Sequence, residues 1–471
     1  MLTFVFGMRL KLNMIERFSK LIALFTITII IGCSETSEKN STYFGGKIIN
    51  PKTDYVVLFD HQKVVDTFYL DQNNTFLGEL PSLKEGLFYF RHSNEHQYVY
   101  LYPKDSVLIR LNTFDFDESL VFSGKGALRN NLLIDCFLDT EKDNKLFFSF
   151  YNLDPESFLS KVKFLEEVRL KRFKDFKIKN PNESDEFLSI LKIALTYPLY
   201  GHVENYPLLH KMKKHDMNHE VDESFYSHRK KIAANNDSIM YFGAYRNFIV
   251  NRIYNKVYTS GLKADSDEFT IALLKSIARD ITNQDYKNIM LRQTILRNFY
   301  NKATCQYNPE TFNTYFSLTD NSNDRRLINL LLNDTKKLNT GKKFNSFKII
   351  DYNHTARSIK SLIKRKNSFI YFWNPEYASK DYIGGGIQYL SHKFPNVKFI
   401  GVRIDGDGID RLMKIDIKDQ YYLNSKSVAN EFLTSKMPRA LIINNKGVLV
   451  NGYASLSSRN TFNQLKELSK K

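Results

Sequence analysis

The three cysteines decide which thiol chemistry is open to this sequence of 471 residues. They are Cys33, Cys136 and Cys305, far apart along the chain, and no Cys-x-x-Cys pair occurs. Thiol–disulfide exchange needs a nucleophilic thiolate with a resolving thiol close by, so dithiol chemistry of that kind is excluded. For Cys136 and Cys305 we expect buried, small apolar side chains, and the alternative is a structural disulfide between them.

Three histidines form a second group whose spacing suggests chemistry. His210, His215 and His219 lie in HKMKKHDMNH, and the last two are four residues apart, as metal ligands on a helix would be. No glutamate follows His215 as in a His-Glu-x-x-His site, and the neighbouring lysines oppose a cation. We therefore expect a solvated polar loop rather than a metal site.

Aspartates cluster once, in IDGDGID, which contains Asp405, Asp407 and Asp410. Ile409 stands where a calcium-binding loop needs a ligand, so we expect a plain loop after a strand. The sequence contains no Gly-x-Ser-x-Gly and no P-loop. We expect no metal, no cofactor and no catalytic residue from these patterns.

The N-terminus resembles that of a bacterial lipoprotein. A basic stretch precedes a short apolar run that ends in Ile30-Ile31-Gly32-Cys33, which is similar to a lipobox. The resemblance implies a signal peptide over 1–32, acylation of Cys33 and a polar tether over 33–41. An ordinary secretory signal with an incidental cysteine is the alternative. Translation begins at Met1, Met8 or Met14.

The polar tether also resembles the acidic tags of surface lipoproteins of the Bacteroidetes type. It implies a cell-envelope protein anchored by lipid, in the outer membrane on its periplasmic or its surface face. The net charge of +17 is compatible with anionic lipid or polysaccharide, although lysines dispersed over solvated helices are the favoured explanation. No nucleic-acid motif is present, so we expect no nucleic-acid partner.

The remaining sequence divides into three segments. Residues 42–126 contain short strands rich in β-branched and aromatic residues, which predict an all-β, antiparallel sandwich or barrel. Residues 127–338 have helical periodicity and predict a helical domain. Residues 341–471 alternate apolar strands with helices and predict an α/β layer with some parallel sheet.

The last segment resembles the thioredoxin-like domain of TlpA/ResA-type proteins. The resemblance rests on Phe372-Trp373 ending a strand in YFWNPEYASK, on the turn at Pro375 before a helix, and on Met437-Pro438 before the hairpin sequence RALIINNKGVLVNGY. It implies a cis bond before Pro438. The order of the segments resembles Bacteroidetes-type lipoproteins with a β-domain, a helical middle and a thioredoxin-like C-terminus.

The departure from this family concerns its two cysteines. Counted from Phe372-Trp373, they fall on Tyr377 and Lys380, which cannot form a disulfide. Gly384, Gly385 and Gly386 stand where the family has a kink-forming proline, and each glycine costs a helix about 1 kcal/mol relative to alanine. We expect either a loosened helix there or a loop with a helix that begins at Ile387.

These patterns favour a non-enzymatic protein whose thioredoxin-like domain is redox-inactive and serves as a binding or scaffold module. The resemblance implies a peptide-binding groove beside Trp373, Met437 and Pro438, with a protein or peptide partner, and a membrane contact through the lipid anchor. The alternatives are a thiol–disulfide oxidoreductase-related protein, and an envelope lipoprotein that handles polysaccharide or nutrients. Fold alone does not separate these functions.

Overall fold

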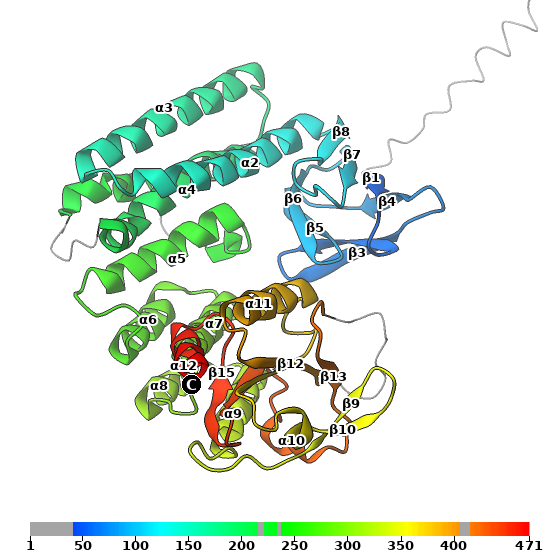
Figure 1. Ribbon diagram of the computed structural model, residues 1–471. Coiled ribbons are helices and arrows are strands. Elements are labelled where there is room, and N and C mark those ends of the chain that lie inside the picture. The colour runs from blue at the N-terminus through cyan, green and yellow to red at the C-terminus, as the bar shows by residue number, and fades with distance from the viewer. Residues whose placement is uncertain (1–40, 215–220, 233–236, 406–414, 471) are drawn as a thin grey trace, which may run out of the picture. The chain divides into compact units, whose positions relative to one another are not determined.

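A computed structural model describes residues 41–214, 221–232, 237–405 and 415–470 (Figure 1). Several predictions made above concern residues outside these ranges and stay predictions: Cys33, His215, His219, Asp407, Ile409 and Asp410. Among the described residues, none of the helices is both long enough and apolar enough to cross a membrane.

The chain separates into two compact units. Unit 1 combines the chain up to Phe150 with Ser160–Leu199, and unit 2 combines Tyr151–Leu159 with Tyr200–Lys471. The division falls inside helices α3 (Pro155–Lys179) and α4 (Asp185–Lys214). Because the units do not follow the three segments expected from the sequence, the boundaries 42–126, 127–338 and 341–471 stay a prediction.

Unit 1 begins with eight strands in two four-stranded sheets, ordered β4-β1-β7-β8 and β3-β2-β5-β6. The strands are β1 (Ser41–Ile49), β2 (Tyr55–Asp60), β3 (Lys63–Tyr69), β4 (Thr75–Pro81), β5 (Gly86–His92), β6 (Glu95–Leu101), β7 (Ser106–Asn112) and β8 (Val121–Lys125). The prediction of a wholly antiparallel arrangement is wrong at one place, because β1 runs parallel to β7. These strands are distant in sequence, so no tight hairpin fixes their direction.

One hydrophobic core serves both sheets of unit 1. Phe44 of β1 and Val107 of β7 pack in the same cluster as Leu58 of β2 and Phe90 of β5. Ile134 of helix α2 (Ala127–Phe150) joins this cluster. The strands therefore share their core with a helix of the same unit, and an independent all-β domain stays a prediction.

Four successive helices in the helical part of unit 2 have polar N-terminal caps. The helical part contains η1 (Glu223–Lys231), η2 (Asp237–Ile239), α5 (Gly243–Tyr258), α6 (Asp267–Asp280), α7 (Gln284–Lys302), α8 (Pro309–Leu318) and α9 (Ser322–Lys336). The side chains of Ser266, Asn283, Asn308 and Asn321 accept hydrogen bonds from the first-turn amides of α6, α7, α8 and α9. Each cap satisfies a donor that the helix itself leaves unpaired, which explains where these helices begin.

A seven-stranded sheet forms the rest of unit 2, in the order β10-β9-β13-β12-β11-β14-β15. Its elements are β9 (Lys348–Asp351), β10 (Ala356–Ser358), α10 (Ile359–Leu362), β11 (Ser368–Trp373), α11 (Lys380–Lys393), β12 (Lys398–Arg403), β13 (Gln420–Tyr422), η3 (Val428–Phe432), β14 (Arg439–Ile443), β15 (Leu449–Ala454) and α12 (Arg459–Ser469). Strands β11, β12 and β13 are parallel, whereas β14 is antiparallel to both β11 and β15.

The central strand β11 is buried along its whole length and divides the core into two layers. Ile370 and Phe372 pack on one face of the sheet, and Phe369, Tyr371 and Trp373 pack on the other together with residues of α11 and α12. A strand covered on both faces has no polar side, which explains the unbroken apolar run in the sequence. The site considered next lies at the C-terminal end of this strand.

Candidate functional site

The chain leaves β11 through a tight turn before it enters α11. The carbonyl of Asn374 accepts hydrogen bonds from the amides of Tyr377 (3.0 Å) and Ala378 (3.3 Å), and its side-chain oxygen accepts one from the amide of Glu376 (3.0 Å). Ser379 then caps α11 by accepting a hydrogen bond from the amide of Tyr382. Asparagine and serine at these positions hold the backbone in the turn and fix the start of the helix.

Tyr377 and Lys380, the positions expected to replace the family's cysteines, differ in their setting. Tyr377 precedes the helix and is 39% exposed, whereas Lys380 is the first residue of α11 and is exposed. Partial burial raises the pKa of the Tyr377 hydroxyl, the carboxylate of Glu376 raises it further, and Arg292 opposes both. Helix α11 thus begins at Lys380, and Tyr377 lies in the turn before it.

The glycine run after this turn does not interrupt the helix. Gly384, Gly385 and Gly386 lie within the continuous helix Lys380–Lys393, so the alternative of a loop before Ile387 is wrong. A Cβ atom at Gly386 would lie 3.2 Å from the Leu456 side chain, which indicates close packing at that position. Tertiary packing thus offsets the low helix propensity of glycine.

Met437 and Pro438 approach the same end of the sheet from the other side. The described residues contain no cis peptide bond, so the predicted cis bond before Pro438 is wrong. Met437 is buried, and its amide donates to the Ser435 hydroxyl (3.3 Å). The carbonyl of Pro438 accepts a hydrogen bond from the hydroxyl of Tyr300 of α7 (3.1 Å).

A cavity of about 470 Å³ lies between these two stretches and the helices α7 and α9. We call it the tyrosine cavity, since its lining includes Tyr300, Tyr371, Tyr377 and Tyr382 together with Met437 and Pro438. Two of the three residues expected at a groove, Met437 and Pro438, thus line one cavity together with Tyr377, which was expected to replace a cysteine. Trp373 does not line it, because its side chain is 1% exposed and packs in the core beneath α11.

The residues that the helical part contributes to this cavity could not be predicted from the sequence. Arg292 and Tyr300 of α7 and Leu327 of α9 line it, although they precede Met437 by more than a hundred residues in the chain. The guanidinium of Arg292 is held by the Asp324 carboxylate at 2.7 Å. A periodic pattern can identify α7 as a helix, but it cannot say which sheet edge that helix covers.

Buried charged residues support the loop that carries Met437 and Pro438. Asp334 of α9 is 0% exposed and accepts hydrogen bonds from the amides of Thr434 (2.8 Å) and Ser435 (3.0 Å) and from the hydroxyls of both residues (2.6 and 2.7 Å). Arg439 is also 0% exposed, donates to the carbonyl oxygens of Phe432 (2.8 Å) and Gly452 (3.0 Å), and has its pKa lowered by burial. This polar support fixes one wall of the tyrosine cavity.

The two described cysteines are free thiols, so the alternative of a disulfide between them is wrong. Burial raises the pKa of the Cys136 thiol to about 12. Burial also raises the pKa of the Cys305 thiol, while the charge of Arg439 opposes the rise. Thiols with raised pKa values are poor nucleophiles at neutral pH, and neither cysteine lines the tyrosine cavity.

The other polar clusters found in the sequence are structural where they are described. His210 lies in α4 and is buried, with its Nδ1 2.8 Å from the carbonyl oxygen of Tyr151, so the prediction of a solvated loop is wrong for this residue. Asp405 accepts a hydrogen bond from Nε of Arg403 (2.7 Å), as in a plain loop after β12. Within the described ranges, no group of histidine, cysteine and acidic side chains is arranged to hold a metal ion.

Several solved structures are similar to part of this chain, with TM-scores near 0.24. A thiol:disulfide interchange protein from Bacteroides sp. is 16% identical over 28% of this chain and 92% of its own (TM-score 0.24). A domain of a possible thiol-disulfide isomerase from Cytophaga hutchinsonii is 16% identical over 28% and 98% (0.24), and the thioredoxin domain of a Bacteroides vulgatus thiol-disulfide oxidoreductase is 16% identical over 28% and 97% (0.23). No family model and no curated protein matches the chain.

The fold of the sheet region follows from its own topology. Strands β11, β12 and β13 are parallel, α11 connects β11 to β12, and the antiparallel hairpin β14–β15 follows on the other side of β11 and leads into α12. This is the arrangement expected from the resemblance noted in the sequence. Part of unit 2 therefore has a thioredoxin-like fold, in which Tyr377 lies in the turn after β11 and Lys380 begins α11.

Proposed function

We propose that the thioredoxin-like part of this protein binds a peptide segment of a partner protein at the tyrosine cavity and does not exchange disulfides. The observation that carries the proposal is the meeting of Tyr377, Met437 and Pro438 in one cavity with no cysteine in its lining. The cavity volume of about 470 Å³ lies within the range that binding pockets of proteins occupy. It suits one or two side chains of a peptide rather than a folded surface.

The composition of the tyrosine cavity favours protein recognition. Tyrosine offers a large rigid surface with a hydroxyl at its edge and is enriched at protein interfaces. Tyr377 is 39% and Tyr382 is 55% exposed, so both are accessible at the mouth, whereas Tyr371 is buried. Two accessible aromatic side chains and a buried one together form a pocket for an apolar or aromatic residue of the partner.

The first test measures redox activity and binding separately. We expect the wild-type protein to reduce insulin no faster than buffer, and measurable turnover would favour a thiol oxidoreductase instead. For binding, peptides selected from a display library on the wild-type protein are titrated against Tyr377→Ala and against Tyr389→Ala, which removes a 55% exposed tyrosine of α11 that does not line the cavity.

We expect Tyr377→Ala to weaken the selected peptides about tenfold or more, as for an interface anchor, and Tyr389→Ala to leave them unchanged. Peptides that bind both variants equally well would contradict binding at the tyrosine cavity. Circular dichroism of both variants controls for folding.

We also propose that acylated Cys33 anchors the protein in the cell envelope, in the outer membrane. The support is the lipobox-like sequence ending in Cys33. Replacing Cys33 with alanine should release soluble protein or leave a precursor in the inner membrane, while Cys136→Ala should fractionate as the wild type does. Outer-membrane fractionation of Cys33→Ala that matches the wild type would contradict the anchor.

A further inference from the structure

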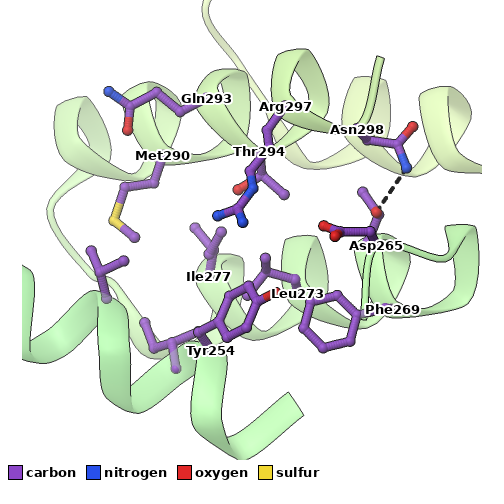
Figure 2. A pocket seen from close by; sticks show the side chains of 13 residues that line it. Tyr254, Asp265, Phe269, Leu273, Ile277, Met290, Gln293, Thr294, Arg297 and Asn298 are labelled. Carbon is purple, nitrogen blue, oxygen red and sulfur yellow. Dashed lines mark hydrogen bonds between the residues drawn. The ribbon is translucent and has the colours of Figure 1, made fainter. Parts of the chain in front are cut away.

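A second cavity lies in the helical part of unit 2, among α5, α6 and α7 (Figure 2). We call it the helix cavity; its volume is about 230 Å³, and it shares no lining residue with the tyrosine cavity. Figure 2 shows Met290, Thr294 and Arg297 extending from α7 toward side chains of the two facing helices, among them Ile277 and Tyr254. Nothing in the proposed function makes use of this space.

Most of the wall of the helix cavity is apolar. Six side chains supply it: Val250, Ile253, Phe269, Leu273, Ile277 and Met290. A cavity of about 150 Å³ with such a lining holds a benzene molecule, and pockets for drug-sized ligands begin near 300 Å³. The volume of about 230 Å³ therefore suits a small molecule with an apolar body of roughly the size of one ring and a short polar end.

Two charged side chains of opposite sign stand at the polar end of the helix cavity, Arg297 and Asp265. Among the described residues, Arg297 has no hydrogen bond or ion pair, and its guanidinium lies 5.6 Å from the centre of the Tyr254 ring. The Asp265 carboxylate accepts only a long hydrogen bond from the Asn301 amide, at 3.4 Å, within the same part of the structure. Both charges are therefore available to a ligand.

Two further polar side chains of the wall, Asn298 and Thr270, are already engaged in hydrogen bonds. The amide of Asn298 donates to the Thr270 hydroxyl (2.9 Å), a bond drawn in Figure 2, and the Thr270 hydroxyl donates to the Ser266 carbonyl (2.9 Å). They close the wall rather than attract a ligand. Gln293 and Thr294 complete the polar lining but are uncharged, so Arg297 and Asp265 are the two groups that can pair with charges of a ligand.

We propose that the helix cavity binds a free α-amino acid with a branched aliphatic or aromatic side chain. The ligand carboxylate pairs with Arg297, which offers a planar set of donors suited to a carboxylate. A simple carboxylic acid would pair with Arg297 but leave the Asp265 carboxylate without a cationic partner, whereas the ammonium group of an amino acid pairs with that carboxylate. The apolar side chain of the ligand fills the space beside Leu273, Ile277 and Met290.

The test uses the full chain with ¹³C-labelled methionine methyl groups and two probes, L-leucine and L-phenylalanine. Met290 lines the helix cavity and Met437 lines the tyrosine cavity, so the two methyl signals report each cavity separately. We expect either probe to shift the Met290 signal in a saturable way and to leave the Met437 signal unchanged. Failure of both probes to shift the Met290 signal would overturn the proposal and leave the proposed function untouched.

Variants and ligand analogues test the two charge contacts. We expect Arg297→Gln and Asp265→Asn each to weaken binding about tenfold or more, because each removes a charge-assisted contact. Arg326→Gln, at an exposed arginine of α9 outside both cavities, should bind as the wild type does. The proposal would be overturned if Arg297→Gln bound leucine as tightly as the wild type does. It would also be overturned if the wild type bound leucine and 4-methylpentanoate, which lacks the ammonium group, with equal affinity.

Discussion

At the scale of single residues, the sequence could not predict which charged side chains are buried. Arg439 opens β14 and Glu204 lies within α4, and both are essentially inaccessible to solvent. Charged residues are rarely buried unless they are paired, so a sequence pattern assigns them to the surface. Their hydrogen-bond partners lie on other elements, 7 to 51 residues away in the chain, and become visible only in the folded structure.

Glu204 is held by three partners from other elements of unit 2. Its carboxylate accepts hydrogen bonds from Nε and Nη2 of Arg229 (2.9 and 2.7 Å) and from the Asn255 amide (2.7 Å), and it lies 2.9 Å from Nε2 of His228. Burial alone would raise the pKa of Glu204, but the hydrogen bonds and the charge of Arg229 outweigh it and lower the pKa from 4.5 to about 2. The ionised form is therefore the one that the fold stabilises.

We expect this carboxylate to make the stability of unit 2 depend on acid pH. Because the folded pKa lies below the unfolded one, its contribution of roughly 3 kcal/mol is complete above pH 4.5 and is lost as the pH falls toward about 2. Glu204→Gln should be less stable than the wild type at neutral pH by a similar amount. The difference between the two proteins should shrink over that acid range in urea unfolding curves.

The matched control is Glu431→Gln, which removes an exposed carboxylate of the same unit. Its stability should follow that of the wild type at every pH. A difference between Glu204→Gln and wild type that stays constant down to about pH 2 would show that the carboxylate is not held as described.

At the scale of elements, regular patterns predicted the structure well, and exceptions arose where packing overrides them. The hairpin predicted around Asn445-Lys446-Gly447 is confirmed as β14–β15, with Gly447 at φ 77° in the turn. In contrast, α4 continues through Pro198 and Pro207, where a helix is expected to end. Burial of many of its side chains offsets the cost of these prolines, which no local pattern can show.

Local sequence patterns also could not predict the whole lining of the tyrosine cavity. Met437 and Pro438 were expected at a groove because they precede the hairpin of a recognisable sheet. Tyr300 and Arg292 were not predicted as lining residues, because their place at the cavity depends on how α7 packs against the sheet. Trp373 was expected at the groove, but the alternation along β11 directs it into the layer beneath α11.

The start of α11 leads to a prediction about introduced thiols. Lys380 is the first helical residue, so a cysteine there would lie among unpaired amides that stabilise a thiolate. Tyr377 precedes the helix beside Glu376, a setting that raises rather than lowers the pKa of an acidic group. We expect the thiol of Lys380→Cys to have a pKa about one unit below the ~8.5 of free cysteine, and the thiol of Tyr377→Cys not to be lowered.

The measurement is the pH dependence of alkylation by iodoacetamide, followed at each peptide by mass spectrometry. The native Cys136 and Cys305 serve as internal controls, because burial raises the pKa of both thiols and should keep them slow. If the thiol at position 377 titrates below the one at position 380, the helix begins earlier than Lys380.

At the scale of the whole molecule, polar contacts hold the helical part of unit 2 against its sheet. Side chains near β15 and α12 bind the end of α7: the amide of Asn451 donates to the Ala303 carbonyl (2.7 Å), and the Ser458 hydroxyl donates to the Asn301 carbonyl (2.9 Å). Asp334 of α9 holds Thr434 and Ser435 in the loop before β14. We infer that α7, α9 and the sheet unfold together.

Asp334 offers the sharpest test of this coupling. It is 0% exposed and accepts hydrogen bonds from two amides and two hydroxyls, all of which lose their acceptor in Asp334→Ala. Unsatisfied buried donors cost about 1–3 kcal/mol each, partly relieved by water, so we expect a loss of about 3 kcal/mol or more. Hydrogen exchange should accelerate in α7, α9, β14 and β15 alike, with peptides of unit 1 unchanged.

The control is Asp285→Ala, at an exposed aspartate in the first turn of α7, which should cost only a few tenths of a kcal/mol through the helix dipole.

The two possible outcomes of Asp334→Ala separate two views of the molecule. Faster exchange in the sheet together with α7 and α9 means that they form one cooperative unit. Faster exchange in β14 and β15 while α7 and α9 keep wild-type protection would contradict the coupling. It would favour instead the division near residue 340 that the sequence predicts, because a separate domain can open without the helices beside it.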